Sequence, residues 1–200
     1  MYTSVYTFYT RGKYVDMQVF LPYANVAQSF QALDMRRLNK QHLELHQLMV
    51  CVNKKRRGEP TSHHAAVNLF VDHPTFLAYC FVLCVEICLE RGVHINAYYN
   101  EYKELEQKFQ QPQRIDKPQW YFHEKFHLAH RQALLAKSYA RLITSGNKSR
   151  VEQKAARDEY NWYRSFGWVE QVQTSRYHYY WWNAEKHVLY QGAVRDALEE

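Results

Sequence analysis

The sequence feature that most constrains the fold is a long apolar run, PTFLAYCFVLCVEICLE, which begins at Pro74 and is closed by Gly92. Proline at the start and glycine just past the end are the usual bounds of a helix, so the run predicts a buried helix over 75–91. No run of 18 apolar residues exists in the chain, and we therefore expect no transmembrane helix and no membrane partner.

Three of the four cysteines, Cys80, Cys84 and Cys88, recur every four residues within this run and share one apolar face of the predicted helix. Their spacing differs from a CxxC zinc pair and no second pair follows, so we interpret them as small core thiols and expect no metal site. Reduced thiols, together with an N-terminus that lacks a signal peptide, favour an intracellular, cytoplasmic protein.

The rest of the chain predicts helices of ordinary length. We expect an all-α, compact, single-domain fold with this central helix and an extended N-terminal arm, which leaves 1–16 as the arm and 17–200 as the helical domain. The Tyr/Thr-rich arm could also form a short strand. Further helices are expected at 25–52 (with Asn25 as N-cap), 63–71, 98–114, 122–143, 149–160 and 184–198.

Charge and aromatic content favour a polyanionic partner without specifying one. The formal charge is +6 and the aromatic fraction is 16%, with many aromatic side chains beside Lys, Arg or His. Aromatic rings next to cations suit unstacked bases and phosphates, although ordinary core packing explains the same composition. The six glycines form no phosphate-binding loop, and no cofactor is expected.

The densest group of reactive side chains is LDMRRLNKQHLELH, residues 33–46. On a helix, Asp34, Arg37, Gln41 and Glu44 share one stripe, and Arg36 and Lys40 form a neighbouring basic pair. Two carboxylates and an arginine are costly to bury unless they line a cleft or are fully paired. The stripe is therefore either a functional cleft or a solvated face with ordinary ion pairs.

A second polar helix carries His123, His127 and His130 at helical spacing. The string HEKFH at 123–127 has the residue pattern HExxH of zinc proteases, but so short a match alone is weak evidence, and a metal site is not favoured. His130 and Arg131 on a basic helix better suit phosphate contacts.

Four segments, taken in order, resemble a known family. They are FLPYANVAQSFQALDMRRLNKQHLE, then HHAAVNLFVDHPTF with CLERG, then FHLAHRQALLAK, and finally WYRSFG at 162–167. Together they are similar to the pyrimidine-dimer DNA glycosylases, the phage endonuclease V type and its bacterial relatives, over about residues 17–167.

The resemblance implies an all-α enzyme that acts on damaged or modified double-stranded DNA, as a monomer and without a cofactor. In this family the N-terminal α-amine attacks the deoxyribose C1′ to form a Schiff base, assisted by a glutamate carried on a helix. The damaged base is released, and β-elimination then cuts the strand, which makes the enzyme a glycosylase and AP lyase. The target nucleotide must leave the base stack before this chemistry.

The sequence departs from the family pattern at the nucleophile and at the glutamate. Sixteen residues precede Met17, so the amine comes from Met17 as the true start, or from Met1 if the arm folds back, with Lys40 in reserve. By simple offset the family glutamate falls on Arg37, whereas Glu44 matches the bacterial type of motif. We therefore expect Glu44 as the catalytic carboxylate, steered and kept ionised by Arg37, with Asp34 as the next candidate.

The same reasoning assigns the DNA contacts and leaves two other functions open. A non-catalytic DNA-binding protein on this scaffold, or another enzyme acting on a modified base or nucleotide, would fit the same residues. The expected DNA-contacting residues are Arg36, Lys40, Gln41, His130, Arg131, Lys137, Trp162 and Tyr163, with Phe166 in the same aromatic loop.

Overall fold

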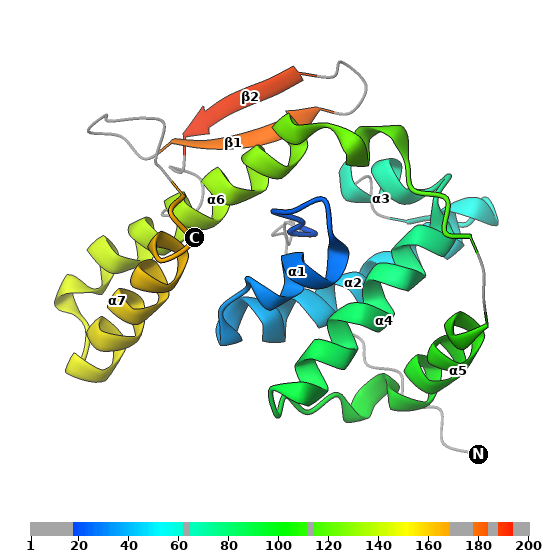
Figure 1. The fold of residues 1–200 in the computed structure, drawn as a ribbon, viewed down its shortest axis with the longest axis horizontal. Helices are drawn as coiled ribbons and strands as arrows, with labels where there is room; N and C mark the ends of the chain where they lie inside the picture. The colour runs from blue at the N-terminus through cyan, green and yellow to red at the C-terminus, as the bar shows by residue number, and fades with distance from the viewer. Residues whose placement is uncertain (1–17, 62–64, 112–113, 169–177, 184–187, 194–200) are drawn as a thin grey trace.

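A computed structural model describes residues 18–61, 65–111, 114–168, 178–183 and 188–193. The predicted arm, residues 1–16, and Met17 lie outside the described residues. The all-α class is confirmed, with one small β-hairpin added near the C-terminus (Figure 1). The α-helices are α1 (Val26–Gln31), α2 (Met35–Arg56), α3 (Ala65–Phe70), α4 (Pro74–Glu90), α5 (Tyr99–Gln110), α6 (Glu124–Thr144) and α7 (Arg150–Arg164).

The apolar run forms α4, which lies among α1, α2, α3 and α5 (Figure 1). Its bounds agree with the predicted 75–91 to within one residue, and Cys80, Cys84 and Cys88 are fully buried, as expected. The helix ends before Gly92, whose φ of 75° lies in the left-handed region that glycine adopts without strain. None of the described helices is both long and apolar enough to span a bilayer.

The single helix predicted over 25–52 is wrong, because the chain forms two helices there. Asn25 does cap the first, accepting a hydrogen bond from the Gln28 amide at 2.9 Å. A turn then follows, and the Asp34 carboxylate starts α2 by accepting from the Arg36 and Arg37 amides at 2.9 and 3.1 Å. An aspartate at this position satisfies amides that an uninterrupted helix would bond internally, so it favours a new helix start.

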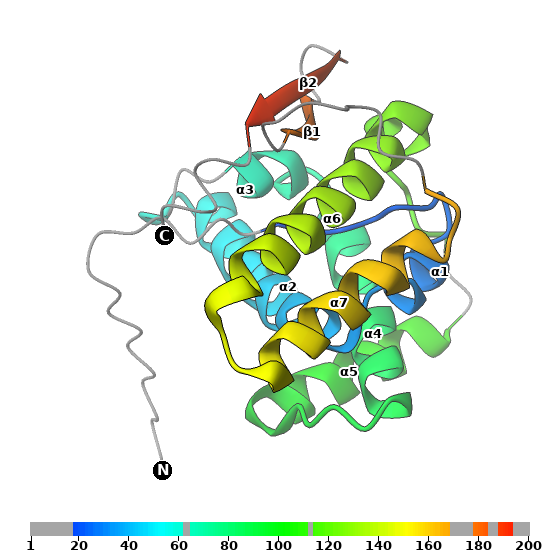
Figure 2. The same ribbon diagram turned by 90° about the vertical axis from the view of Figure 1, so that its left-hand side faces the viewer.

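Helices α6 and α7 lie side by side (Figure 2), joined by the short turn Ser145–Asn147. A capping box between Ser149 and Glu152 begins α7, which extends to Arg164, four residues beyond the predicted end at 160. The indole Nε1 of Trp162 donates to the Ala32 carbonyl at 2.8 Å. This bond fastens the end of α7 to the turn between α1 and α2.

The helix predicted over 184–198 is also wrong. Strand β1 (His178–Asn183) pairs with strand β2 (Val188–Ala193) as an antiparallel hairpin that lies against α6 (Figure 1). His178 is opposite Ala193, and Asn183 is opposite Val188. Helix-forming residues around this segment led to the prediction of a helix. The aromatic and β-branched residues of HYYWWN and VLY favour strands instead, and each paired strand supplies hydrogen-bond partners for the backbone of the other.

Candidate nucleic-acid site

The extended segment 18–23 lies between α2 and α6, and Gln41 of α2 holds its first part. The Gln41 Oε1 accepts from the Phe20 amide at 2.9 Å, and its Nε2 donates to the Gln18 carbonyl at 2.9 Å. Gln41 is only 1% exposed, so these two bonds satisfy an amide that would otherwise be buried without partners. The backbone just after Met17 is thereby fixed on α2, one turn from Glu44.

Helix α6 holds the second part of the same segment. The Leu21 amide donates to Nδ1 of His130 at 2.9 Å, and the Leu21 carbonyl lies 2.7 Å from Nδ1 of His127. The Arg131 Nε donates to the Pro22 carbonyl at 2.8 Å. Desolvation lowers the pKa of His130 to about 3, which leaves its ring neutral and able to accept this bond.

Three side chains that the sequence analysis assigned to DNA thus form hydrogen bonds with the protein backbone, namely those of Gln41, His130 and Arg131. Their hydrogen bonds hold the segment 18–23 between α2 and α6, and Arg131 also forms an ion pair with Glu124 at 2.9 Å. A DNA contact from these three residues remains a prediction.

Glu44 lies on the inner side of α2, with its side chain only 6% exposed. Its Oε1 is 3.1 Å from the Lys40 ammonium but has no partner in hydrogen-bond geometry among the described residues. Burial raises the pKa of the Glu44 carboxyl, and Lys40, then Lys137 and Arg37, act in the opposite direction. We had assigned this opposing effect to Arg37, but Lys40 contributes more of it.

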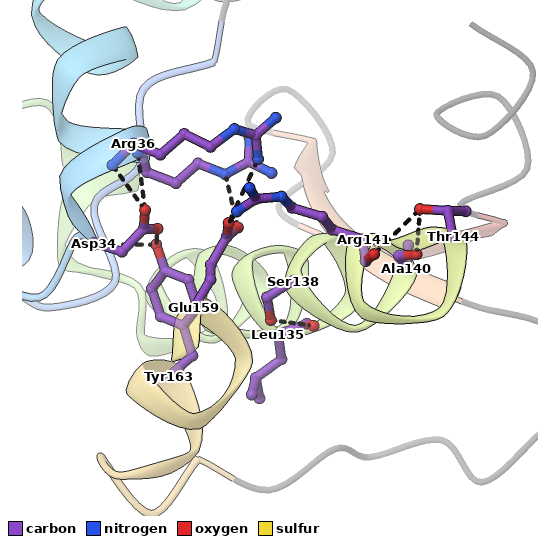
Figure 3. A network of polar contacts seen from close by, with 10 residues as sticks. Asp34, Arg36, Leu135, Ser138, Ala140, Arg141, Thr144, Glu159 and Tyr163 are labelled. Carbon is purple, nitrogen blue, oxygen red and sulfur yellow. Dashed lines mark hydrogen bonds and ion pairs between the residues drawn. The ribbon is translucent and has the colours of Figure 1, made fainter. Parts of the chain in front are cut away.

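A second buried carboxylate, Glu159 of α7, faces three arginines (Figure 3). Its Oε2 lies 3.5 Å from Arg36 Nη1 and accepts a hydrogen bond from Arg141 Nη1, while its Oε1 is 3.8 Å from Arg37 Nε. Arg36 and Arg37 come from the first turn of α2, and Arg141 comes from α6. The cluster therefore joins three helices at one place.

Arg37 connects the two carboxylates. It is close enough to Glu44 to affect that carboxyl electrostatically, and it approaches Glu159 directly. Within the part of the chain that the structure describes, neither Arg37 Nε nor Glu159 Oε1 has a hydrogen-bond partner, so the two atoms form an ion pair without a hydrogen bond. Buried charges with unused hydrogen-bonding capacity are a common property of functional sites.

The sequence analysis missed Glu159 and Arg141. A signal for Glu159 was present, since Ala156 and Tyr163 flank it at helical spacing and both are fully buried. That spacing places Glu159 on the inward face of α7. Arg141 follows Lys137 by four residues on α6, so one face of that helix carries both cations.

The other predicted residues have structural partners. The Tyr163 hydroxyl, fully buried, donates to the Asp34 carboxylate, whose other oxygen caps α2, so Asp34 is fully engaged (Figure 3). Trp162 is partly exposed and has the Arg91 guanidinium 5.9 Å from its ring centre. Phe166 stacks on Trp168. Trp162 and Tyr163 therefore lie in the last turn of α7 and not in a loop as predicted, and they brace the helices that carry the charged side chains.

Taken together, two nearly buried carboxylates lie within a group of five cations drawn from α2 and α6. A buried carboxylate can accept a proton or stabilise a nearby cation, and surplus arginines and lysines suit phosphates. Among the described residues, no group of three or more His, Cys, Asp or Glu side chains could hold a metal ion. The five cations are Arg36, Arg37, Lys40, Lys137 and Arg141.

Comparison with known proteins identifies one family. Residues 17–101 match the family model described as pyrimidine dimer DNA glycosylase, a segment that holds α1 to α4, Glu44 and three of the five cations. The resemblance found in the sequence is confirmed over this segment. No curated protein and no solved structure gives a significant match.

Proposed function

We propose that this protein is a glycosylase with AP-lyase activity on damaged or modified pyrimidines in duplex DNA, because residues 17–101 match the family model described as pyrimidine dimer DNA glycosylase. Glu44 is its catalytic carboxylate. The observation that carries the proposal is Glu44 itself, a carboxylate on a side chain 6% exposed, 3.1 Å from the Lys40 ammonium and within electrostatic reach of Lys137 and Arg37.

The nucleophile is an amine brought to Glu44 by the segment that Gln41 holds. Gln18, whose carbonyl Gln41 binds, directly follows Met17, and consecutive Cα atoms are about 3.8 Å apart. The described backbone at Gln18 therefore lies against the Glu44 helix, and the proposal takes Met17, its covalent neighbour, as the source of the amine. An α-amine has a pKa near 8, so a useful fraction of it is neutral and nucleophilic at pH 7. Met1 and Lys40 are the alternative sources of the amine.

In the first step the amine nitrogen forms a bond to C1′, and the bond from C1′ to the damaged base breaks. The base leaves with the bonding electrons and takes up a proton. Ionised Glu44 stabilises the positive charge on the sugar and accepts the proton that the amine loses. The ring then opens to a Schiff base. Loss of a C2′ proton and departure of the 3′ phosphate cut the strand.

The five cations bind the phosphates on either side of the target nucleotide. Because each Lys or Arg that contacts a phosphate releases condensed counterions, DNA affinity should fall steeply as salt rises. Trp162 and Tyr163 support this surface by fixing the end of α7 to the start of α2.

Borohydride trapping tests the proposal directly. The full chain is mixed with a duplex that carries one cyclobutane pyrimidine dimer, or one abasic site, and sodium borohydride is added. A covalent protein–DNA adduct is expected with both duplexes, and mass spectrometry of the digested adduct then identifies the amine of the full chain as Met1 or Lys40. A chain that begins at Met17, where that residue carries the free α-amine, is tested in parallel. Salt-sensitive binding without any adduct would instead indicate a non-catalytic DNA-binding protein.

A further inference from the structure

The proposed chemistry leaves Glu159 without a role, although it is among the most buried charged residues described. Its carboxylate lies among the guanidinium groups of Arg36, Arg37 and Arg141, which reach it from α2 and α6 (Figure 3). A carboxylate on the inward face of a helix is costly to bury unless such partners compensate it. The arginines compensate the buried negative charge of Glu159, and Glu159 in turn reduces the repulsion among the arginines.

The charges of the cluster do not cancel. Three guanidiniums share one carboxylate, so two positive charges remain in surplus. The side chains of Arg36 and Arg141 are 57% and 29% exposed, whereas that of Glu159 is 3% exposed. The surplus charge therefore faces solvent, and the compensating charge lies beneath it. Without that carboxylate, the three like charges would repel one another and turn outward.

We propose that Glu159 is a positioning residue that holds Arg36, Arg37 and Arg141 together as one phosphate-binding cluster for the DNA backbone. This inference rests on the proposed function, since it assigns a backbone phosphate to the cluster. Arg37 has a further effect, because it also faces Glu44. The cluster therefore holds the bound phosphate at a fixed position relative to the Glu44 carboxylate, which acts at the sugar.

Net charge alone and a positioning role predict opposite effects of removing Glu159 on DNA affinity, which makes the proposal testable. Loss of one negative charge should strengthen DNA binding if only net charge matters. Loss of a positioning residue should weaken it, because the arginines no longer share one geometry. Asp158, the preceding residue of α7, provides the matched control, since it is exposed and pairs with Lys154 at 2.6 Å.

The experiment compares full-length wild type, Glu159→Gln and Asp158→Asn on a fluorescent duplex that carries a tetrahydrofuran abasic-site analogue. Fluorescence anisotropy gives Kd over a series of NaCl concentrations. For Glu159→Gln we expect the affinity for DNA to fall about tenfold. The slope of log K against log salt should become shallower by the equivalent of about one to two phosphate contacts. Asp158→Asn should bind as the wild type does or slightly more tightly.

Arg36→Gln is the second variant, chosen because an exposed arginine can be removed without unfolding the chain. It should weaken binding and lower the salt slope, and its effect should not add to that of Glu159→Gln if the two residues act as one unit. In turnover, both should raise KM more than they lower kcat. Equal affinities for Glu159→Gln and Asp158→Asn, or wild-type binding by Arg36→Gln, would overturn the inference. If the wild type itself binds no duplex, it is the proposed function that fails.

Discussion

Lys40 and Glu44 form an ion pair across one turn of α2, with the ammonium 3.1 Å from the carboxylate oxygen. The two partners differ in environment, because the Lys40 side chain is 53% exposed and that of Glu44 is 6% exposed. Burial raises the pKa of the Glu44 carboxyl, and Lys40 is the main group that lowers it. The ionised form of Glu44 thus depends on a solvent-exposed lysine.

Replacing that lysine should change the pH dependence of catalysis. In Lys40→Gln the pKa of Glu44 should rise further, because burial then acts with less opposition. Since the ionised carboxylate is the active form, activity is lost as pH falls through this pKa, and the acid limb of the single-turnover profile should move to higher pH. Lys54→Gln, at the other end of α2, is the control. An acid limb unchanged in Lys40→Gln would contradict this account of Glu44.

Gln41 should contribute to the stability of the fold. Gln41→Ala leaves the buried Phe20 amide without its acceptor, and we expect a loss of about 1–3 kcal/mol in the free energy of unfolding. Urea unfolding measures this, with the exposed Gln47→Ala on the same helix as the control. Equal stabilities of the two variants would mean that the segment 18–20 is not held as described.

The cysteines should differ sharply in reactivity. Burial raises the pKa of the Cys80 and Cys84 thiols, and Cys88 is also fully buried, whereas Cys51 is partly exposed. Ellman's reagent should therefore modify at most one thiol of the folded protein quickly, and all four after denaturation. Rapid reaction of two or more thiols in the folded state would contradict the buried position of α4.

The sequence was sufficient where a pattern is repeated along one element. Pro74, Gly92 and the three cysteines defined α4 to within one residue, because helix bounds and apolar spacing are local properties. The same local reasoning failed at Asp34, where the choice between a continuous helix and a new cap depends on packing against Tyr163, 129 residues away. It also failed at the hairpin, where strand pairing competes with helix-forming residues.

The candidate site was predicted in part for the same reason. Arg37, Gln41 and Glu44 lie within one helix, with Asp34 as its N-cap, so their shared stripe could be derived from spacing alone. Glu159 approaches them only because α7 folds back onto the start of α2. His130 was predicted to contact phosphate, and its bond with the Leu21 amide could not be derived from the sequence. Contacts between distant segments decide such roles, and the sequence does not contain them explicitly.

The catalytic role of Glu44 is the central claim, and Glu44→Gln in the full chain tests it most directly. The substitution preserves size and shape but removes the charge, so DNA affinity should stay within about twofold of the wild type while the rate loses an acid–base group. Glu104→Gln, an exposed glutamate on α5, is the matched control. The measurement is the single-turnover rate of glycosidic-bond cleavage in a duplex with one pyrimidine dimer, in which the cleaved base stays joined to its dimer partner. We predict a fall of at least about a hundredfold for Glu44→Gln and none for the control, whereas full activity of Glu44→Gln would contradict the account.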